Sequence, residues 1–531
     1  MVVLLHDILD RNASDHPDLL FATGAGRTLR YGDAAEQSRH WARALVASGI
    51  GVGDRIAVLS PNCSEFLLLY FAASRAGAVV VPLNMRLSGE ELAFILRDAA
   101  PRAVFAHASV RDRRDPIRPQ LPSARHWISF GEPTPSGDEW MDSERWVQAA
   151  GHGPDPPRGT PDRDLLQLYT SATTGMPKGA VLTQRAVVTN VHQIAGVVSL
   201  SRGDRALVVA PMFHASLVPG VLAPIFHGAT LLIHRRFVPA DTVDALAHER
   251  VAYTLLVPTM IQACLDVVEE RGHPGFPHLK LIYYGASPIT EGLLRRALAT
   301  FGHGFIQSYG LTEATQAVTF LTPAEHERGL REQPALLRTA GRAAPETTLR
   351  IVDPDDRELP PGAPGEIVVR GPQVMRGYWN RPEETARTLR GGWLHTGDVG
   401  SLDEDGYLYV FDRVKDMIIS GGENVYSTVV EDALGQHADV AEAAVIGLPH
   451  PYWGECVHAV IVLEPGVPPT TQTAERIVAA CRERLAGFEV PRSIQFVDDL
   501  PQNASGKVLK RLLREHAQAT PVTEFAWHAE H

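Results

Sequence analysis

The chain has 531 residues, of which 44% are hydrophobic and 21% charged. This ordinary globular composition excludes a disordered tail, a collagen and a coiled-coil rod, and the length allows more than one domain. The formal net charge of −12 lacks the strong basicity of nucleic-acid-binding proteins, so any anionic ligand must be held by local cations and backbone amides.

The first 345 residues alternate short β-branched runs with helical patterns. Residues 55–60 and 78–82 are predicted strands on either side of a helix over 64–76. Further strands are predicted at 206–210, 230–233, 253–257 and 280–284. This alternation predicts βαβ units and a parallel sheet. The Pro-, Gly- and Asp-rich residues 131–164 are predicted to be a surface linker or loop.

The pattern changes after residue 345. Short strands separated by turns at 349–353, 366–370 and 406–410 predict an antiparallel sheet. A small unit follows Lys415, with strands at 417–419, 443–446 and 457–463 and helices at 428–434 and 473–486. The predicted fold class is therefore α/β. A large N-terminal domain, 1–414, would combine βαβ layers with a small antiparallel sheet or barrel, and 415–531 would form a small α+β C-terminal domain.

Two absences in the sequence suggest where the protein acts. No run of about 18 uncharged apolar residues is present, and the apolar start of the chain meets His6 and Asp7 too early for a signal peptide. Four widely spaced cysteines form no CxxC pair, so neither a zinc cluster nor a disulfide framework is indicated. We expect a cytoplasmic protein without a membrane span.

The most informative segment is residues 168–181, which read LYTSATTGMPKGAV. Hydroxyl groups and backbone N–H groups can surround phosphate oxygens, glycine allows close approach of the backbone, and lysine adds a positive charge. The loop is not a Walker A motif, because GxxxxGK[ST] is absent. The alternative to phosphate binding is that this segment is simply a polar loop between two strands. The candidate phosphate-binding residues are Thr170, Ser171, Thr173, Thr174, Gly175 and Lys178.

This segment resembles the phosphate loop YTSGTTGxPKG of the adenylate-forming superfamily, which includes acyl-CoA synthetases, luciferases and the adenylation domains of peptide synthetases. Six further matches follow in the family's order and extend the resemblance over nearly the whole chain. They are GASP at 285–288, QSYGLTE at 307–313, WLHTGD at 393–398, DRVKD at 412–416, SGGEN at 420–424 and LPQNASGK at 500–507.

The resemblance implies a nucleotide site and its catalytic groups. Tyr309 would stack on adenine, Asp398 and Arg413 would contact the ribose, and Glu313 would supply the hard oxygen ligand that Mg²⁺ prefers. Outside these motifs the same residues would be read as a core tyrosine, a turn aspartate and surface charges. Lys507, Thr312, Glu313 and Lys178 are the catalytic candidates. The resemblance also implies nucleotide contacts from Gly285, Ala286, Ser287, Gln307, Ser308, Gly310 and Thr312.

The resemblance also implies an acyl pocket and a moving C-terminal domain. His214, Gly285 and Gly310 would line the pocket, although a lone histidine beside apolar residues is equally well read as a core residue. Lys415 would be the hinge about which the C-terminal domain turns between two half-reactions. Gly421 and Gly422 would then lie along the path of CoA, unless they are simply a flexible turn.

Two positions depart from the family pattern. Ala172 replaces a glycine of the phosphate loop, and its methyl group would block a positive φ angle or tighten the loop. With an ordinary φ angle at Ala172 the loop still works, so we interpret this substitution as a tuning change. Ser427 replaces a proline that usually follows Val425-Tyr426, and we expect this change to loosen one turn only.

The implied function is ATP-dependent activation of a hydrophobic carboxylic acid to acyl-AMP, followed by transfer to CoA with release of AMP and pyrophosphate. The acid stays open among fatty, branched or cyclic, and aryl acids. Two alternatives remain: an adenylating enzyme that loads a carrier-protein thiol, and a non-catalytic sensor of acyl groups or nucleotides. We expect ATP, CoA, Mg²⁺ and a small carboxylic acid as ligands and no nucleic-acid partner. The oligomeric state stays open, with a homodimer as one option.

Overall fold

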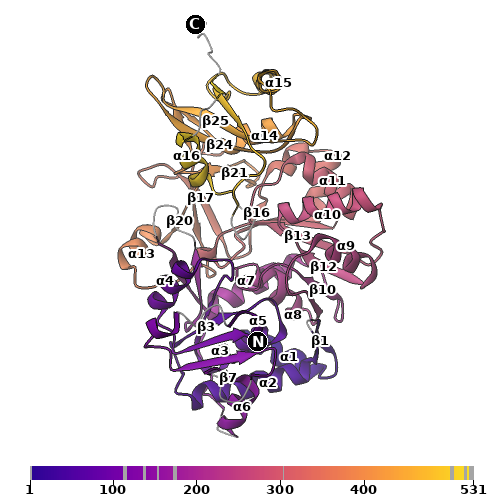
Figure 1. Ribbon diagram of the computed structural model, residues 1–531, viewed down its shortest axis with the longest axis vertical. Coiled ribbons are helices and arrows are strands. Elements are labelled where there is room, and N and C mark those ends of the chain that lie inside the picture. The colour runs from indigo at the N-terminus through magenta and orange to yellow at the C-terminus, as the bar shows by residue number, and fades with distance from the viewer. Residues whose placement is uncertain are drawn as a thin grey trace.

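The structure is a computed structural model. It describes residues 3–24, 26–111, 117–134, 139–151, 155–170, 176–302, 304–502, 508–519 and 523–524. Over these residues the chain forms two large, mainly parallel sheets with helices packed on them, an antiparallel sheet and a C-terminal domain. In Figure 1 the parallel sheets lie below and the C-terminal domain lies at the upper end of the long axis.

The first sheet has eight strands, and its centre is parallel. Every residue of its central strand β4 is buried, as expected for a parallel strand covered on both faces. In spatial order the strands are β19 (Gly377–Tyr378), β9 (Lys178–Thr183), β8 (Asp164–Thr170), β4 (Val79–Pro82), β3 (Arg55–Leu59), β5 (Ala103–His107), β6 (His126–Phe130) and β7 (Met141–Asp142).

The second sheet has nine strands, of which six consecutive ones, from β14 to β1, run parallel, while the pairs at both edges are antiparallel. In spatial order they are β16 (Arg342–Ala343), β15 (Thr319–Leu321), β14 (Phe305–Tyr309), β13 (Leu281–Gly285), β12 (Val251–Leu255), β10 (Arg205–Val208), β11 (Thr230–Ile233), β1 (Leu20–Gly24) and β2 (Arg27–Arg30). The carboxyl ends of β13 and β14 lie next to each other, which is where ligands of open α/β sheets usually bind.

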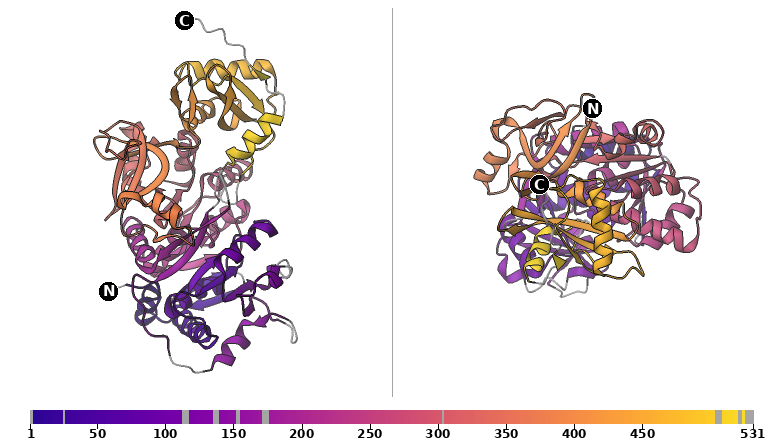
Figure 2. Two further views of the ribbon diagram at one scale, coloured as in Figure 1. Left: turned by 90° about the vertical axis from the view of Figure 1, so that its left-hand side faces the viewer. Right: turned by 90° about the horizontal axis from the view of Figure 1, so that it is seen from above.

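The antiparallel sheet and the C-terminal domain follow in the chain. The antiparallel sheet contains β17 (Thr348–Val352), β18 (Gly365–Arg370), β20 (Leu394–Leu402) and β21 (Leu408–Arg413). Figure 2 shows it beside the C-terminal domain. The sheet of that domain contains β22 (Ile418–Ser420), β23 (Glu423–Val425), β24 (Val440–His450), β25 (Gly454–Leu463), β26 (Ser493–Phe496) and β27 (Thr523–Glu524). The predicted α/β fold with a large N-terminal domain, an antiparallel sheet and a small C-terminal domain is confirmed.

Helices cover these sheets, and among the described residues none is both long and apolar enough to cross a bilayer. In the N-terminal domain they are α1 (Leu5–Asp15), α2 (Tyr31–Ala47), α3 (Ser64–Ala76), α4 (Gly89–Ala99), α5 (Ala108–Arg111), α6 (Ser143–Ala150), α7 (Gln184–Val197), α8 (Ala223–Phe226), α9 (Pro239–His248), α10 (Pro258–Arg271), α11 (Glu291–Phe301), α12 (Pro323–Arg331) and α13 (Pro382–Thr388). The C-terminal domain contributes α14 (Ser427–Gly435), α15 (Thr471–Arg482) and α16 (Lys510–Ala519).

The prediction of a linker over 131–164 is wrong for residues 141–150, which form β7 and α6. Two tryptophans anchor this stretch. Trp146 is 3% exposed and packs edge-on against Trp41, and Trp140 is equally buried and packs edge-on against Trp127. The turn-forming composition of the segment hid these anchors, because aromatic burial outweighs local turn propensity.

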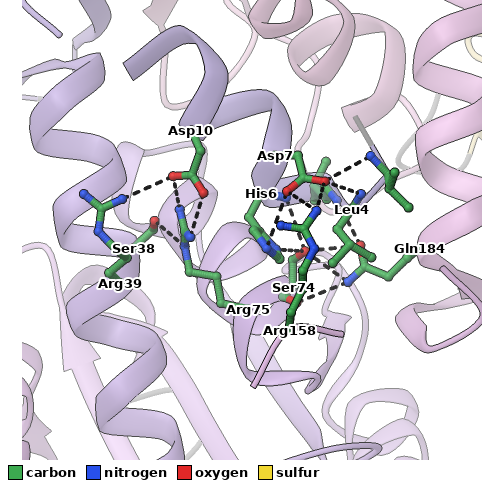
Figure 3. A network of polar contacts seen from close by, with 12 residues as sticks. Leu4, His6, Asp7, Asp10, Ser38, Arg39, Ser74, Arg75, Arg158 and Gln184 are labelled. Atoms are coloured by element: carbon green, nitrogen blue, oxygen red, sulfur yellow. Dashed lines mark hydrogen bonds and ion pairs between the residues drawn. The ribbon is translucent and has the colours of Figure 1, made fainter. Parts of the chain in front are cut away.

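A network of polar contacts fastens α1 to its neighbours (Figure 3). Arg75 of α3 binds both carboxylate oxygens of Asp10, at 2.6 and 2.9 Å. The Nδ1 atom of His6 lies 2.9 Å from the Ser74 hydroxyl, which in turn donates to Gln184 of α7. Because α3 connects two strands of the first sheet and α7 connects the first sheet to the second, the network joins separate parts of the N-terminal domain around one short helix.

Buried histidines make the fold sensitive to acid. Burial lowers the pKa of His6 to about 4, with Arg75 adding to the shift, and burial lowers the pKa of His326 to about 4 as well. The ring nitrogens of His326 lie 2.8 Å from the Thr322 carbonyl and 2.8 Å from the Tyr284 hydroxyl, an arrangement that suits a neutral ring. Since the unfolded chain has ordinary histidine pKa values near 6.5, protons favour unfolding between about pH 6.5 and pH 4.

We therefore expect the melting temperature to fall as the pH drops from 7.5 to 5, with each histidine removing about 1–2 kcal/mol at pH 5. His326→Gln is expected to have a lower melting temperature than the wild type at pH 7.5. Its melting temperature should then fall less than that of the wild type when the pH drops to 5. The exposed residue His278 provides the control, and His278→Gln should keep the wild-type acid response. An equal response in all three proteins, measured by differential scanning fluorimetry, would contradict this account.

Candidate functional site

The candidate site begins where β13 and β14 end side by side. Gly285 lies opposite Ser308 in the parallel pair, and a Cβ atom at Gly285 would lie 2.3 Å from the Ser308 carbonyl oxygen. A Cβ atom at Gly310 would lie 1.5 Å from the carbonyl oxygen of Gln316. Both glycines are therefore required by close backbone packing. The next residue after β13, Ala286, has a φ angle of 70°, a strained conformation of the kind that gathers at functional sites.

Tyr309, Asp398 and Arg413 form a contact group built from three strands. The Tyr309 hydroxyl donates to Oδ2 of Asp398 at 2.7 Å, and Nε of Arg413 lies 3.0 Å from Oδ1. Asp398 of β20 lies directly opposite Arg413 of β21, so the antiparallel register sets this ion pair. Burial and the Asp398 charge raise the pKa of Tyr309 well above its ordinary value, which keeps the phenol protonated. Three motif residues far apart in the sequence thus meet at the end of β14.

Glu313 and Lys178 meet around Tyr378. The Tyr378 hydroxyl donates to Oε1 of Glu313 at 2.7 Å, and Nζ of Lys178 lies 5.4 Å from the centre of the Tyr378 ring. Glu384 of α13 lies 3.8 Å from the same ammonium group. Burial raises the pKa of Tyr378, Glu313 adds to the rise and Arg413 opposes it. The Arg413 charge thus acts on both tyrosines, Tyr309 and Tyr378.

The described residues include only part of the predicted phosphate loop. Thr170 and Lys178 lie opposite each other in the β8–β9 pair, at the two ends of that loop. Thr312 opens the short 3₁₀ turn Thr312–Ala314 next to Glu313. Gln307 and Ser308 belong to β14, Ser287 follows Ala286, and the Ser308 hydroxyl accepts a hydrogen bond from Gln316. Ser171, Ala172, Thr173, Thr174, Gly175 and Lys507 lie outside the described residues.

His214 is partly buried beside Phe213, with ring centres 4.6 Å apart. Burial, helped by the charge of Arg86, lowers the pKa of His214 to about 4, so the ring is neutral near pH 7. Within the described residues its Nε2 atom has no hydrogen-bond partner and is buried. The acyl-pocket reading of His214, Gly285 and Gly310 stays a prediction.

The predicted hinge lies in a turn after β21. The N–H groups of Asp416 and Met417 both donate to the Arg413 carbonyl and close this turn, while the N–H of Val414 donates to the carbonyl of Gly397. Asp412, just before the turn, accepts from the backbone N–H and the hydroxyl of Ser427, both at 2.6 Å. Lys510 of α16 also contacts the Ser427 hydroxyl. The residue at the family's proline position therefore makes two hydrogen bonds across the turn, so the expectation that it only loosens a turn is wrong.

Gly421 and Gly422 form the two-residue loop of the β22–β23 hairpin. Their φ angles are 63° and 88°, and Ser420 pairs with Glu423 on either side. Two left-handed residues in a two-residue hairpin loop define a tight type I′ turn, for which glycine is strongly favoured. A Cβ atom at Gly421 would lie 2.8 Å from the Trp453 ring, so a larger residue would not fit.

Sequence reasoning missed two residues of this site, Tyr378 and Glu384. Tyr378 follows Gly377 in a turn-rich stretch, and an aromatic residue after glycine there was the only available signal. Glu384 lies among the charged residues of α13 with no distinguishing pattern. The structure brings the motif residues Tyr309, Glu313, Asp398, Arg413 and Lys178 into two adjoining groups, and Tyr378 touches members of the second.

The fold and these two groups define an adenylate-forming enzyme, and comparison with known proteins agrees. The AMP-binding enzyme family matches residues 9–379, and the AMP-binding enzyme C-terminal domain matches residues 429–507. The chain therefore belongs to the AMP-binding enzymes.

Similar proteins include enzymes with named acids and acceptors. Feruloyl-CoA synthase of Amycolatopsis sp is 38% identical over 95% of this chain and 97% of its own length. Fatty acid–[acyl-carrier-protein] ligase ScoC of Streptomyces coeruleorubidus is 36% identical over 92% of each chain. The structure of o-succinylbenzoate CoA synthetase from Bacillus subtilis, in complex with its acyl-adenylate intermediate, matches with a TM-score of 0.80 and 29% identity, covering 96% of this chain and 97% of that one.

The protein is thus an acid–thiol ligase of the acyl-CoA synthetase type. It activates a carboxylic acid with ATP to an acyl-adenylate and transfers the acyl group to CoA.

Proposed function

We propose that Tyr309, Asp398 and Arg413 bind the nucleoside part of ATP for the activation of a hydrophobic acid. The observation that carries this proposal is the contact of Asp398 with both Tyr309 and Arg413. A carboxylate has about four acceptor positions, so Asp398 can accept from ribose hydroxyls while it keeps both partners. Fixed in this way, Tyr309 would present its ring to adenine, and Gly285, Ala286, Ser287, Gln307, Ser308 and Gly310 would form the surrounding backbone.

The phosphates of ATP would lie against Lys178, Thr312 and the loop residues Thr170, Ser171, Thr173, Thr174 and Gly175. Mg²⁺ is part of this proposal, with Glu313 as its ligand. One oxygen of Glu313 accepts from Tyr378, which leaves the other for a metal ion. Within the described ranges, no group of three or more His, Cys, Asp or Glu side chains could hold a metal alone. This suits Mg²⁺, which usually combines one or two carboxylates with substrate phosphates and would neutralise part of their charge.

The chemistry needs positioning and charge rather than a side-chain nucleophile. In the first step an oxygen of the acid bonds to the α-phosphorus of ATP, and pyrophosphate leaves with the electrons of the broken P–O bond. In the second step the sulfur of CoA, having lost its proton, bonds to the acyl carbon, and AMP leaves. Lys178 and Lys507 would neutralise the anions that meet in the first step, and His214, Gly285 and Gly310 would line the acyl pocket.

The two steps would use two arrangements of the C-terminal domain. We place the domain boundary between residues 414 and 415 and the hinge at Lys415, because the turn at 414–416 joins β21 to the C-terminal domain. Gly421 and Gly422 would then lie along the pantetheine path, where a turn without side chains leaves room for a narrow chain. ATP and CoA are cytoplasmic metabolites, so a cytoplasmic location is part of the proposal.

Measuring pyrophosphate release over a panel of acids tests the proposal. The panel contains ferulate, indoleacetate, octanoate, palmitate and acetate, each with ATP, Mg²⁺ and CoA. We expect turnover with at least one of the larger acids and little with acetate. Replacing CoA by a phosphopantetheinylated carrier protein tests the acceptor, since ScoC is named for such a carrier. Failure to form AMP with every acid and thiol would overturn the proposal.

A further inference from the structure

The segment around Tyr378 is held between two parts of the candidate site. Gly377 and Tyr378 pair with Val181 and Ala180 as strand β19. The N–H of Trp379 donates to the Gly179 carbonyl at 2.8 Å, and the N–H of Met375 donates to the Glu313 carbonyl at 2.7 Å. The backbone on both sides of Tyr378 is therefore fixed, on one side to the strand that begins with Lys178 and on the other to the turn that carries Glu313.

The side chain of Tyr378 uses this placement to touch two charged groups. Its hydroxyl donates to Glu313 at 2.7 Å, and its ring lies 5.4 Å from the Lys178 ammonium. A carboxylate on a short 3₁₀ turn has several accessible rotamers, and a hydrogen bond from a fixed donor selects one of them. A cation near the face of an aromatic ring is held by the ring's negative face.

We propose that Tyr378 is a positioning residue that orients the Glu313 carboxylate toward the metal ion bound to ATP and fixes the Lys178 ammonium beside it. The inference rests on the proposed roles of Glu313 and Lys178. Glu384, 3.8 Å from Lys178, balances the ammonium charge before ATP arrives. The hydroxyl of Tyr378 thus acts through Glu313 and its ring acts through Lys178.

Tyr378→Phe separates these two actions, because it removes only the hydroxyl and keeps the ring and the backbone pairing. Calorimetric titration of ATP, in Mg²⁺ and separately in EDTA, measures the gain in affinity that the metal supplies. We expect that gain to shrink about tenfold in Tyr378→Phe, while affinity in EDTA stays at the wild-type value. The adenylation rate should fall about 10- to 100-fold, as expected for loss of a hydrogen bond to a charged group.

A second tyrosine–glutamate pair provides a matched control. The hydroxyl of Tyr407 donates to Oε1 of Glu325 at 2.8 Å, outside the candidate site. Tyr407→Phe loses the same kind of bond, so it should lower the melting temperature without changing the metal-dependent gain in ATP affinity. The inference is overturned if Tyr378→Phe keeps the wild-type gain, or if Tyr407→Phe loses as much of it.

Glu313→Gln distinguishes failure of this inference from failure of the proposed function. If Glu313→Gln keeps the wild-type gain from Mg²⁺, the metal role of Glu313 is wrong and the inference falls with it. If Glu313→Gln loses the gain and Tyr378→Phe does not, only the positioning role is wrong. If both lose it, the double variant should lose little more than Glu313→Gln alone, because the hydroxyl acts through that carboxylate.

Discussion

Asp398→Asn is expected to lower kcat/KM for ATP by about 10²-fold. Asp398 is 7% exposed, and its carboxylate binds Tyr309 and Arg413 at once. An asparagine keeps the shape but loses the charge, and each lost charge-assisted hydrogen bond to the ribose is worth about 1.5 kcal/mol or more. Two such bonds correspond to about a hundredfold change. Steady-state pyrophosphate release at saturating acid and varied ATP measures the effect.

Glu404→Gln is the matched control for this experiment. Glu404 lies exposed in the turn between β20 and β21, only a few residues from Asp398 in the chain. It should leave kcat/KM for ATP within about twofold, since exposed surface substitutions rarely matter. Tyr309→Phe removes the hydroxyl that donates to Asp398 but keeps the ring. It should therefore lower kcat/KM for ATP less than Asp398→Asn does. Wild-type kinetics for Asp398→Asn would exclude the proposed ribose contact.

Lys415→Pro is expected to separate the two half-reactions. Thioester formation should fall about 10²-fold, while pyrophosphate exchange stays within about threefold. The turn at 414–416 is closed by the N–H groups of Asp416 and Met417, which both donate to the Arg413 carbonyl, so a proline at 415 removes neither of these bonds. It does fix φ near −65° and restricts Val414, which removes the rotation that the second step would need.

The contacts of Ser427 with Asp412 give this prediction its structural basis. Asp412 precedes Lys415 and Ser427 follows it, so a turn of the domain about Lys415 would have to break their hydrogen bonds. Glu404→Pro places a proline in another exposed turn and should leave both half-reactions unchanged. Single-turnover measurement with supplied acyl-adenylate isolates the second step. Equal rates for Lys415→Pro and the wild type in that assay would reject Lys415 as the hinge.

The fold was largely predictable because β-branched runs and helical periods agree with one another along the chain. The strands at 55–59 and 79–82 and the helix between them lie where the pattern placed them. The stretch 141–150 was missed because Trp146 is buried against Trp41, about 100 residues earlier, and the neighbouring Trp140 is buried against Trp127, contacts that no local pattern reveals. Long-range packing decides such segments over local propensity.

Site residues that belong to a recognisable sequence motif could be predicted. Those that reach the site only because two strands pair could not. Tyr309, Asp398 and Arg413 lie in motifs, and the register of β20 and β21 explains why two of them meet. Tyr378 reaches Glu313 only because β19 joins β9, a pairing that local sequence does not encode. Ser427 looked like a minor departure from a pattern, yet its hydroxyl and N–H both bind Asp412.

The pairing of β19 with β9 also has a consequence for biosynthesis. The first sheet gains its edge strand only when residue 378 has left the ribosome, and the second sheet needs β11 near residue 231 to receive β1 near residue 22. Tyr70 of helix α3, fully buried in the finished fold, likewise donates its hydroxyl to the carbonyl of Met212, which is made about 140 residues later. Such long-range closure is slow and leaves apolar surface open to aggregation. We therefore expect the nascent chain to be prone to aggregation until most of its N-terminal domain has been made.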